Sequence, residues 1–145
     1  MNFVPYEETK KQCHDVDNPT SHQYLVQKMF EFMEHNNGLG LAAPQIGIYL
    51  NIFVVNYGGL RAAFFNPTVI HTTNRTEITT EGCLTLPGEL YKVKRNKSVQ
   101  LLALDEKGQK INVRFPAPLS FIMQHEVDHL DGMCIKDKGE RYKHR

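Results

Sequence analysis

The sequence lacks any apolar run that approaches the roughly 20 residues needed for a membrane-spanning helix. It also lacks, near its start, a basic stretch followed by an apolar one, so we expect no secretory signal peptide. An excess of one charge is missing too, because the formal net charge is only +1. Such a weak field does not favour nucleic acid as a partner. We therefore predict no direct binding to nucleic acids or membranes.

Cysteine is scarce as well. The chain has three cysteines, Cys13, Cys83 and Cys134, and an odd number does not suit a framework of disulfides. Free thiols fit a reducing compartment, so we expect the protein to work in a reducing cytoplasm. There, a cysteine close to histidines is more often a metal ligand or a nucleophile than half of a disulfide. Cys13 and Cys134 have no neighbours that suggest a role.

The length and the residue patterns predict one α+β domain over residues 1–145. A hydrophobic fraction of 41% and a charged fraction of 23% are usual for a globular domain with one core. Helical spacing predicts a first helix that is capped by Thr20 or Ser21 and ends near Asn36, and a second helix at about 117–130. Alternation and turn signals predict strands at 51–56, 60–65, 69–79, 99–104 and 110–115. Short connections favour mixed or antiparallel sheets packed around the C-terminal helix, with a frayed tail at 136–145.

The second predicted helix carries the pattern H-E-x-x-H, with its ends at His125 and His129. Two histidines four residues apart lie on one helical face, so both imidazoles can reach the same ion. Glu126 then projects beside that ion, where it can act as a base without being a ligand. The alternative is a chance pair of surface histidines. The apolar neighbours of the motif argue against it, because they predict a helix packed in the core, where polar groups need partners.

A catalytic metal site needs a third ligand and an open position. Cys83 is the candidate, because Gly82 before it lets the backbone bend or approach closely. The alternative for Cys83 is a small buried hydrophobe. One thiolate and two neutral imidazoles leave a divalent ion with a net charge of about +1, which acidifies a bound water. Zinc, ferrous iron, nickel and cobalt all tolerate such ligands.

Two further positions carry predictions. Asp128 is expected to orient a neighbour or to pair with a cation such as Arg95, unless it is a solvated acid. The segment from Gly38 to Gln45 is rich in small residues, but its glycine spacing is not that of a phosphate-binding loop. It predicts either a sheet edge to which a peptide adds as a strand or a tight helix-to-strand connection. The amide of Gln45 could stabilise an oxyanion.

The segments 38–45, 81–85 and 124–132 resemble, in sequence, order and spacing, the three signature motifs of peptide deformylases. The resemblance covers roughly residues 20–136. It implies a metal-dependent hydrolase that removes the N-formyl group from the N-terminal methionine of nascent polypeptides and releases formate. Metal-bound hydroxide would attack the formyl carbon. It also implies N-formylmethionyl peptides as partners, transient contact with the ribosome, and Fe²⁺ as the commonest ion, with Zn²⁺, Ni²⁺ or Co²⁺ as substitutes.

The resemblance also implies a role for each residue that matches a motif. The metal ligands would be Cys83, His125 and His129. The catalytic groups would be Glu126, as general base and then acid, and two donors to the oxyanion, the Gln45 amide and the Leu84 backbone N–H. The substrate cleft and the methionine pocket would be lined by Leu39, Gly40, Glu81, Phe121 and Ile122.

This chain departs from the family pattern at two places. Thr85 stands where the second motif usually has serine, and the chain ends 13 residues after Gly132, whereas common bacterial forms continue into a C-terminal helix. The short end resembles bacteriophage deformylases and puts ribosome docking in doubt. Two rival interpretations stay open at this point. One is a small zinc endopeptidase, which usually takes Glu or His as third ligand, and the other is a non-enzymatic module with a closed structural metal site.

Overall fold

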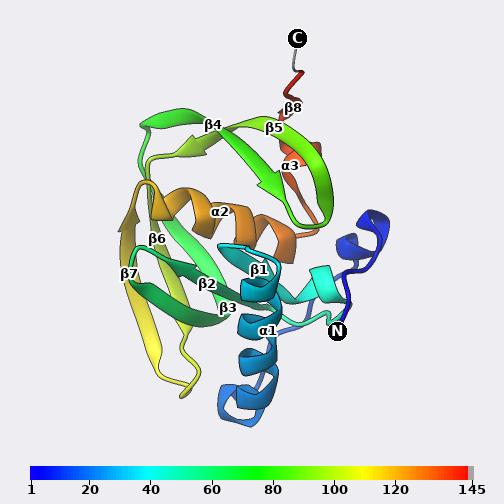
Figure 1. The fold of residues 1–145 in the computed structure, drawn as a ribbon. Helices are drawn as coiled ribbons and strands as arrows, with labels where there is room; N and C mark the ends of the chain where they lie inside the picture. Colours follow the sequence, from blue (N-terminus) through cyan, green and yellow to red (C-terminus); the bar gives the residue numbers. More distant parts are fainter. Residues whose placement is uncertain (144–145) are drawn as a thin grey trace.

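The structure is a computed structural model that describes residues 1–143, in which two β-sheets pack against α-helices (Figure 1). The elements follow one another in the order η1 (Tyr6–Lys10), η2 (Pro19–His22), α1 (Gln23–His35), β1 (Gly40–Ala42), η3 (Ala43–Ile46), β2 (Ile52–Tyr57), β3 (Leu60–Thr72), β4 (Thr76–Cys83), β5 (Leu86–Asn96), β6 (Ser98–Leu104), β7 (Lys110–Pro116), α2 (Leu119–Leu130), α3 (Ile135–Lys138) and β8 (Glu140–Arg141), where η marks a 3₁₀ helix. Among the described residues, no helix is long and apolar enough to cross a membrane.

The strands form a five-stranded sheet in the order β1-β2-β3-β6-β7 and a three-stranded sheet in the order β4-β5-β8. Neighbouring strands in both sheets pair antiparallel. The predicted α+β class is therefore confirmed. The two predicted hairpins form as well, with Tyr57 opposite Leu60 at one turn and Leu104 opposite Lys110 at the other.

Helix α2 runs between the two sheets (Figure 1). Its buried residues Met123 and Leu130 pack into a cluster with Phe53 and Phe64 of the five-stranded sheet. A second cluster lies under α1, where Met29 and Met33 are fully buried. The helix is thus held on its apolar side by the larger sheet, and its histidines face the smaller one.

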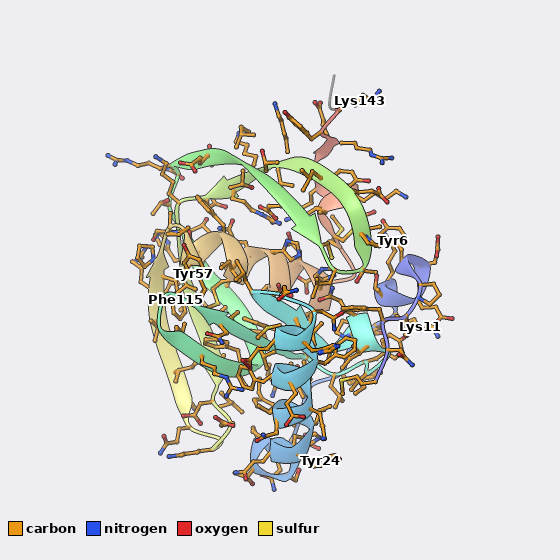
Figure 2. All side chains as sticks on the ribbon, in the orientation of Figure 1. Tyr6, Lys11, Tyr24, Tyr57, Phe115 and Lys143 are labelled. Carbon is orange, nitrogen blue, oxygen red and sulfur yellow. The ribbon has the colours of Figure 1, made fainter. Side chains whose placement is uncertain are left out.

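The first helix starts later than predicted. Its α-helical part begins at Gln23, after a 3₁₀ turn, because the hydroxyls of Thr20 and Ser21 bond to Asn18 and do not cap the helix. The predicted apolar face does pack inward, while Tyr24 on the opposite face is 76% exposed and lies at the end of α1 that points away from the three-stranded sheet (Figure 2). Asn36 follows the last helical residue, His35, as expected.

The strand predicted at 69–79 is wrong as one element, because β3 ends at Thr72 and β4 begins at Thr76. Strand β3 passes through Asn66, where a bulge interrupts the pairing. The backbone of Asn66 has a φ of +51°, and its side chain exchanges two hydrogen bonds with the backbone of Val16. These hydrogen bonds hold the bulge, so strand β3 continues through residues 66–68, where the sequence pattern predicts a gap between two strands.

Strand β5 and the end of the chain were not predicted as they occur. In β5 the buried Tyr91, Val93 and Arg95 alternate with exposed lysines, and that alternation could have identified the strand.

The predicted frayed tail is wrong up to Tyr142, whose backbone N–H donates to the Leu90 carbonyl at 2.8 Å. Helix α3 and strand β8 lie against β5, where Arg141 is opposite Tyr91. The last two residues of the predicted tail, 144–145, lie outside the described residues.

Candidate functional site

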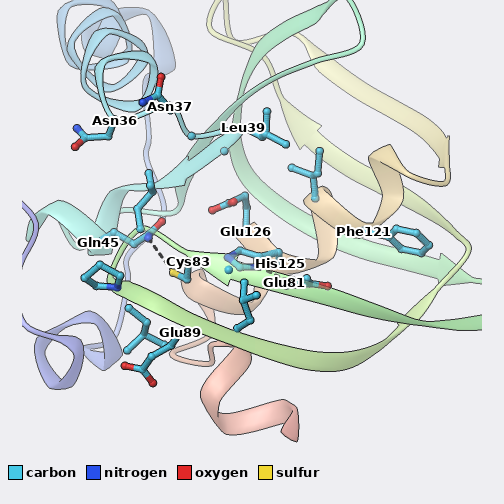
Figure 3. Close-up of a pocket in the computed structure, with 18 of the residues that line it drawn as sticks. Asn36, Asn37, Leu39, Gln45, Glu81, Cys83, Glu89, Phe121, His125 and Glu126 are labelled. Atoms are coloured by element: carbon cyan, nitrogen blue, oxygen red, sulfur yellow. Dashed lines mark hydrogen bonds and ion pairs between the residues drawn. The ribbon is translucent and has the colours of Figure 1, made fainter. Parts of the chain in front are cut away.

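A pocket of about 930 Å³ opens between the edges of the two sheets, and α2 contributes its inner wall (Figure 3). Strand β1 supplies Gly40 on one side, strand β4 supplies Glu81 and Cys83 on the other, and α2 supplies His125 and Glu126. Within the described residues, β1 pairs only with β2, so its other edge is available to a peptide. The small residues at 38–45 therefore form both features that the sequence left open, a tight helix-to-strand connection and a sheet edge on the pocket.

The three predicted ligands converge. One donor atom each from Cys83, His125 and His129 lie within 4.8 Å of one another, and Cys83 Sγ is 3.4 Å from His129 Nε2. Helix α2 brings the two imidazoles together because residues four apart share a face, and the ring centroids are 5.0 Å apart. Cys83 arrives from β4, which has a register irregularity between Glu81 and Cys83 just before the turn to β5.

The electrostatics of this cluster fit a cation. Burial lowers the pKa of His125, but hydrogen bonds to Cys83 and Glu81 outweigh burial and raise this pKa to about 10. Burial and the neighbouring His125 hold the pKa of His129 well below its usual value. The cluster therefore favours one positive charge, on His125, and disfavours a second, on His129. The donor set suits a divalent metal with an open coordination position.

Glu126 lies beside these donors with its side chain turned into the pocket (Figure 3). The residue is 4% exposed, and its Oε1 has no hydrogen-bond partner among the described residues. Burial raises the pKa of Glu126 to about 7, although the charge of His125 opposes this rise. Gly40 packs directly against its carboxylate, since a Cβ at position 40 would lie 2.9 Å from Glu126 Cδ. Glu126 is thus a buried carboxyl group with one oxygen free to exchange a proton.

Gln45 reaches the same point from η3. Its side chain is 2% exposed, and its Nε2 lies 3.5 Å from Cys83 Sγ, along the dashed line in Figure 3. Leu84 follows Cys83 in the turn between β4 and β5, and its side chain packs against Gly38. The structure therefore places both Gln45 and Leu84 next to the candidate metal ligands, although Gln45 and Leu84 are far apart from each other in the sequence.

Glu81 lines the pocket, but both of its carboxylate oxygens are engaged away from it. Oε1 is 2.9 Å from His125 Nδ1, and Arg95 donates to both oxygens at 2.8 and 2.9 Å. Burial disfavours the ionised form, yet the bonds from Arg95 and His125 hold the pKa of Glu81 well below its usual range. Glu81 was predicted to bind substrate. That role stays a prediction; what the structure shows is a carboxylate held against the His125 imidazole, an arrangement usual for carboxylates behind metal ligands.

Arg95 is the centre of this support. It is 2% exposed, and its Nη1 donates to Asp128 at 2.6 Å, so one guanidinium joins β4, β5 and α2. The expectation that Asp128 pairs with Arg95 is confirmed. Lys138 of α3 bonds the other oxygen of Asp128 at 2.9 Å. No sequence pattern signals the contact between Arg95 and Glu81, because Arg95 is opposite Glu77, and not Glu81, in the β4–β5 register.

The remaining predicted residues line the pocket. Leu39 is 51% exposed at its mouth, and Phe121 and Ile122 border it one turn before His125 on α2. The structure adds apolar lining that the sequence did not suggest, from Tyr57, Leu90 and Pro118 among others. Leu90 belongs to the strand missed in the sequence, and its side chain covers Gly82. A mostly apolar pocket with a few polar groups at one end suits a substrate with an apolar side chain.

Comparisons with known proteins agree with this geometry. The family model described as polypeptide deformylase matches residues 3–145. Peptide deformylase 1 of Clostridium perfringens is 37% identical over 140 residues, covering 94% of this chain and 95% of that protein. Across the curated relatives, the matched part covers from 66% to 95% of their own lengths.

Solved structures share the fold. The crystal structure of peptide deformylase from Thermotoga maritima has a TM-score of 0.91 at 28% identity, covering 94% of this chain and 95% of that one. The deformylase of the Vibrio parahaemolyticus bacteriophage VP16T, solved in complex with actinonin, has a TM-score of 0.88 at 28% identity, covering 93% of this chain and 100% of that one. The sequence match and the fold lead to one conclusion: the chain belongs to the peptide deformylase family.

Proposed function

We propose that this chain removes the N-formyl group from N-terminal formylmethionine with the residues gathered around Cys83. Hydrolysis of formyl-methionyl peptides and dependence on a metal are general properties of the family. The observation that carries the assignment to this site is the convergence of three donor atoms within 4.8 Å, beside a buried carboxyl group with a free oxygen. Cys83, His125 and His129 would hold the ion.

A divalent ion held by these residues would polarise the formyl carbonyl and acidify a water molecule. Glu126 would carry the proton: its carboxylate accepts one from the attacking water and then delivers it to the nitrogen of the leaving amine. Burial raises the pKa of Glu126 to about 7 in the absence of an ion, and a group that takes and returns a proton works best when its pKa lies near the working pH. The charge of a bound ion would lower this pKa and favour the base form at the start of the cycle.

Two donors would face the formyl oxygen as it becomes negatively charged. The first is Nε2 of Gln45, next to the candidate ligand Cys83, and the second is the backbone N–H of Leu84. Loss of one such donor typically costs 10²- to 10³-fold in rate. The methionine side chain would enter the apolar part of the pocket beside Phe121 and Ile122, and the peptide backbone would lie along Gly40 and Leu39. Gly40 lies against the Glu126 carboxylate, so an acyl group larger than formyl would have little room beside it.

We assign the ion as Fe²⁺, on the resemblance to the family; zinc, nickel and cobalt also suit one sulfur and two nitrogen donors. Metal analysis of protein purified without oxygen tests this assignment, since oxygen can destroy a ferrous thiolate site. Iron at about one equivalent supports it, and a full equivalent of zinc with little iron contradicts it. The three free cysteines fit a reducing cytoplasm, in a bacterial cell or a phage-infected one. Transient ribosome contact stays a prediction, testable by co-sedimentation.

The activity test measures formate release from formyl-Met-Ala, with an internal peptide bond as the competing substrate. Deformylation without cleavage of the internal bond supports the proposal. Cleavage of the internal bond alone would support the endopeptidase interpretation. Glu126→Ala should keep the ion and the fold but lose turnover, and unchanged formate release would exclude Glu126 as the proton carrier. Cys83→Ser should lower the metal content sharply, whereas Cys13→Ser, which changes a buried cysteine outside the pocket lining, should not.

A further inference from the structure

The Gln45 amide is fixed at both ends. Its Oε1 accepts a hydrogen bond from the Ala42 backbone N–H at 3.0 Å, and its Nε2 donates to Thr85 Oγ1 at 2.9 Å. The side chain is 2% exposed, so water cannot replace either bond. An amide nitrogen carries two hydrogens. One hydrogen is donated to Thr85 Oγ1, and the other points toward Cys83 Sγ, which lies 3.5 Å from Nε2.

The two bonds have different effects. The Ala42 N–H decides which end of the amide faces inward, because a flipped amide would set two N–H donors against each other. The Thr85 hydroxyl then decides the tilt of the amide plane, and with it the direction of the remaining N–H. Thr85 lies in the two-residue turn between Cys83 and Leu86, so the anchor belongs to the same turn that carries the candidate ligand. Threonine is β-branched, so its side chain has few rotamers and the hydroxyl stays in place.

We propose that Thr85 is a positioning residue: by holding one N–H of Gln45, its hydroxyl aims the other, which donates to Cys83 Sγ in the structure, toward the place where the formyl oxygen would lie. Thr85 does not touch the substrate in this proposal and acts only through Gln45. The inference rests on the proposed function, because it assumes that Gln45 stabilises the oxyanion. It predicts a loss in kcat with little change in KM, since a misdirected donor weakens the transition state more than the bound substrate.

The test compares Thr85→Val, which keeps the branched shape and removes the hydroxyl, with Thr85→Ser, which keeps the hydroxyl. We expect kcat on formyl-Met-Ala to fall about 10- to 100-fold in Thr85→Val, less than the loss of a whole oxyanion donor. Thr85→Ser should return most of the activity. Thr76→Val, a matched change on the exposed part of β4 outside the pocket lining, should leave kcat unchanged. In a Gln45→Ala background, Thr85→Val should add no further loss.

A second readout does not depend on turnover. The side-chain NH₂ signals of Gln45 in ¹H–¹⁵N spectra of the zinc-loaded protein should move in Thr85→Val and stay near their wild-type positions in Thr85→Ser. A wild-type kcat in Thr85→Val would overturn the proposal. So would a fall in kcat that is as large when Thr85→Val is made in the Gln45→Ala background as in the wild type. Unmoved amide signals in a folded Thr85→Val protein would do the same. If even the wild type releases no formate, the proposed function fails, and the spectra still report whether Thr85 holds Gln45.

Discussion

The contact between Gly40 and Glu126 gives the sharpest prediction about activity. A Cβ at position 40 would lie 2.9 Å from Cδ and 3.1 Å from Cγ of Glu126 and would overlap its Oε2. The φ of Gly40 is not positive, so alanine suits the backbone there, and the only conflict is with the Glu126 side chain. Relief of the overlap requires the carboxylate to move by about 0.5–1 Å. Gly40→Ala therefore displaces the proposed proton carrier and leaves the strand intact.

The expected magnitudes differ for stability and for activity. An off-rotamer side chain costs about 0.5–1.5 kcal/mol, so the free energy of unfolding should fall by no more than that. A catalytic group misplaced by about 1 Å can cost 10²-fold in rate, or about 2.7 kcal/mol in the activation barrier. We expect kcat on formyl-Met-Ala to fall about 100-fold while the metal content stays at the wild-type value.

The assay combines steady-state kinetics, urea denaturation and metal analysis on Gly40→Ala. A double-mutant cycle with Glu126→Ala isolates the cause, because a Cβ that acts only through this carboxylate should cost nothing further once the carboxylate is gone. Wild-type kcat in Gly40→Ala would refute the reasoning. An equal loss in the Glu126→Ala background would also refute it, since the Cβ would then block the peptide and not the proton carrier.

Three further predictions concern stability. Arg95→Leu leaves the buried carboxylates of Glu81 and Asp128 without their guanidinium. Urea denaturation should show a free energy of unfolding that is lower by about 3–5 kcal/mol, and a change below about 1 kcal/mol would contradict this prediction. Burial raises the pKa of Asp137, but hydrogen bonds from Lys10 and Tyr6 outweigh burial and lower this pKa to about 2. The stability that Asp137 contributes is therefore present above about pH 4 and is lost as the pH falls toward 2. In Asp137→Asn, unfolding measured across that window should show a shallower loss of stability, by about 1 kcal/mol after solvent screening, and an unchanged slope would count against this anchor. A Cβ at Gly139 would overlap a backbone carbonyl of β5. Gly139→Ala should therefore detach the C-terminal segment and make it sensitive to limited proteolysis. Resistance equal to that of the wild type would show that the segment is not held at this contact.

The elements predicted best were those with a local signal. The helix that carries His125 and His129 follows from apolar spacing and from the prolines before it, and the structure starts it at Leu119, within two residues of the expectation. The two hairpins follow from glycine turns between β-branched runs. Strand β5 was not predicted because Pro87 and Gly88, near its start, are usual in turns, although buried and exposed residues alternate from Tyr91. The prediction of a frayed tail was wrong because the charges of the tail suggested a solvated end. In the folded chain, Lys138 forms an ion pair with Asp128, a contact that the sequence pattern does not reveal.

By itself, the sequence determined which residues are chemically able to form the site. Two histidines four apart in a helix share a face, because that follows from backbone geometry within a few residues, and the glycine before Cys83 marked a place where the backbone can bend. Only the tertiary structure decided how these pieces meet. Cys83 reaches His129 across 46 residues, Gln45 reaches Thr85 across 40, and Glu81 turns from the pocket to His125 across 44. Such contacts depend on sheet register and on the packing of α2 between two sheets, and periodicity along the chain carries no information about either.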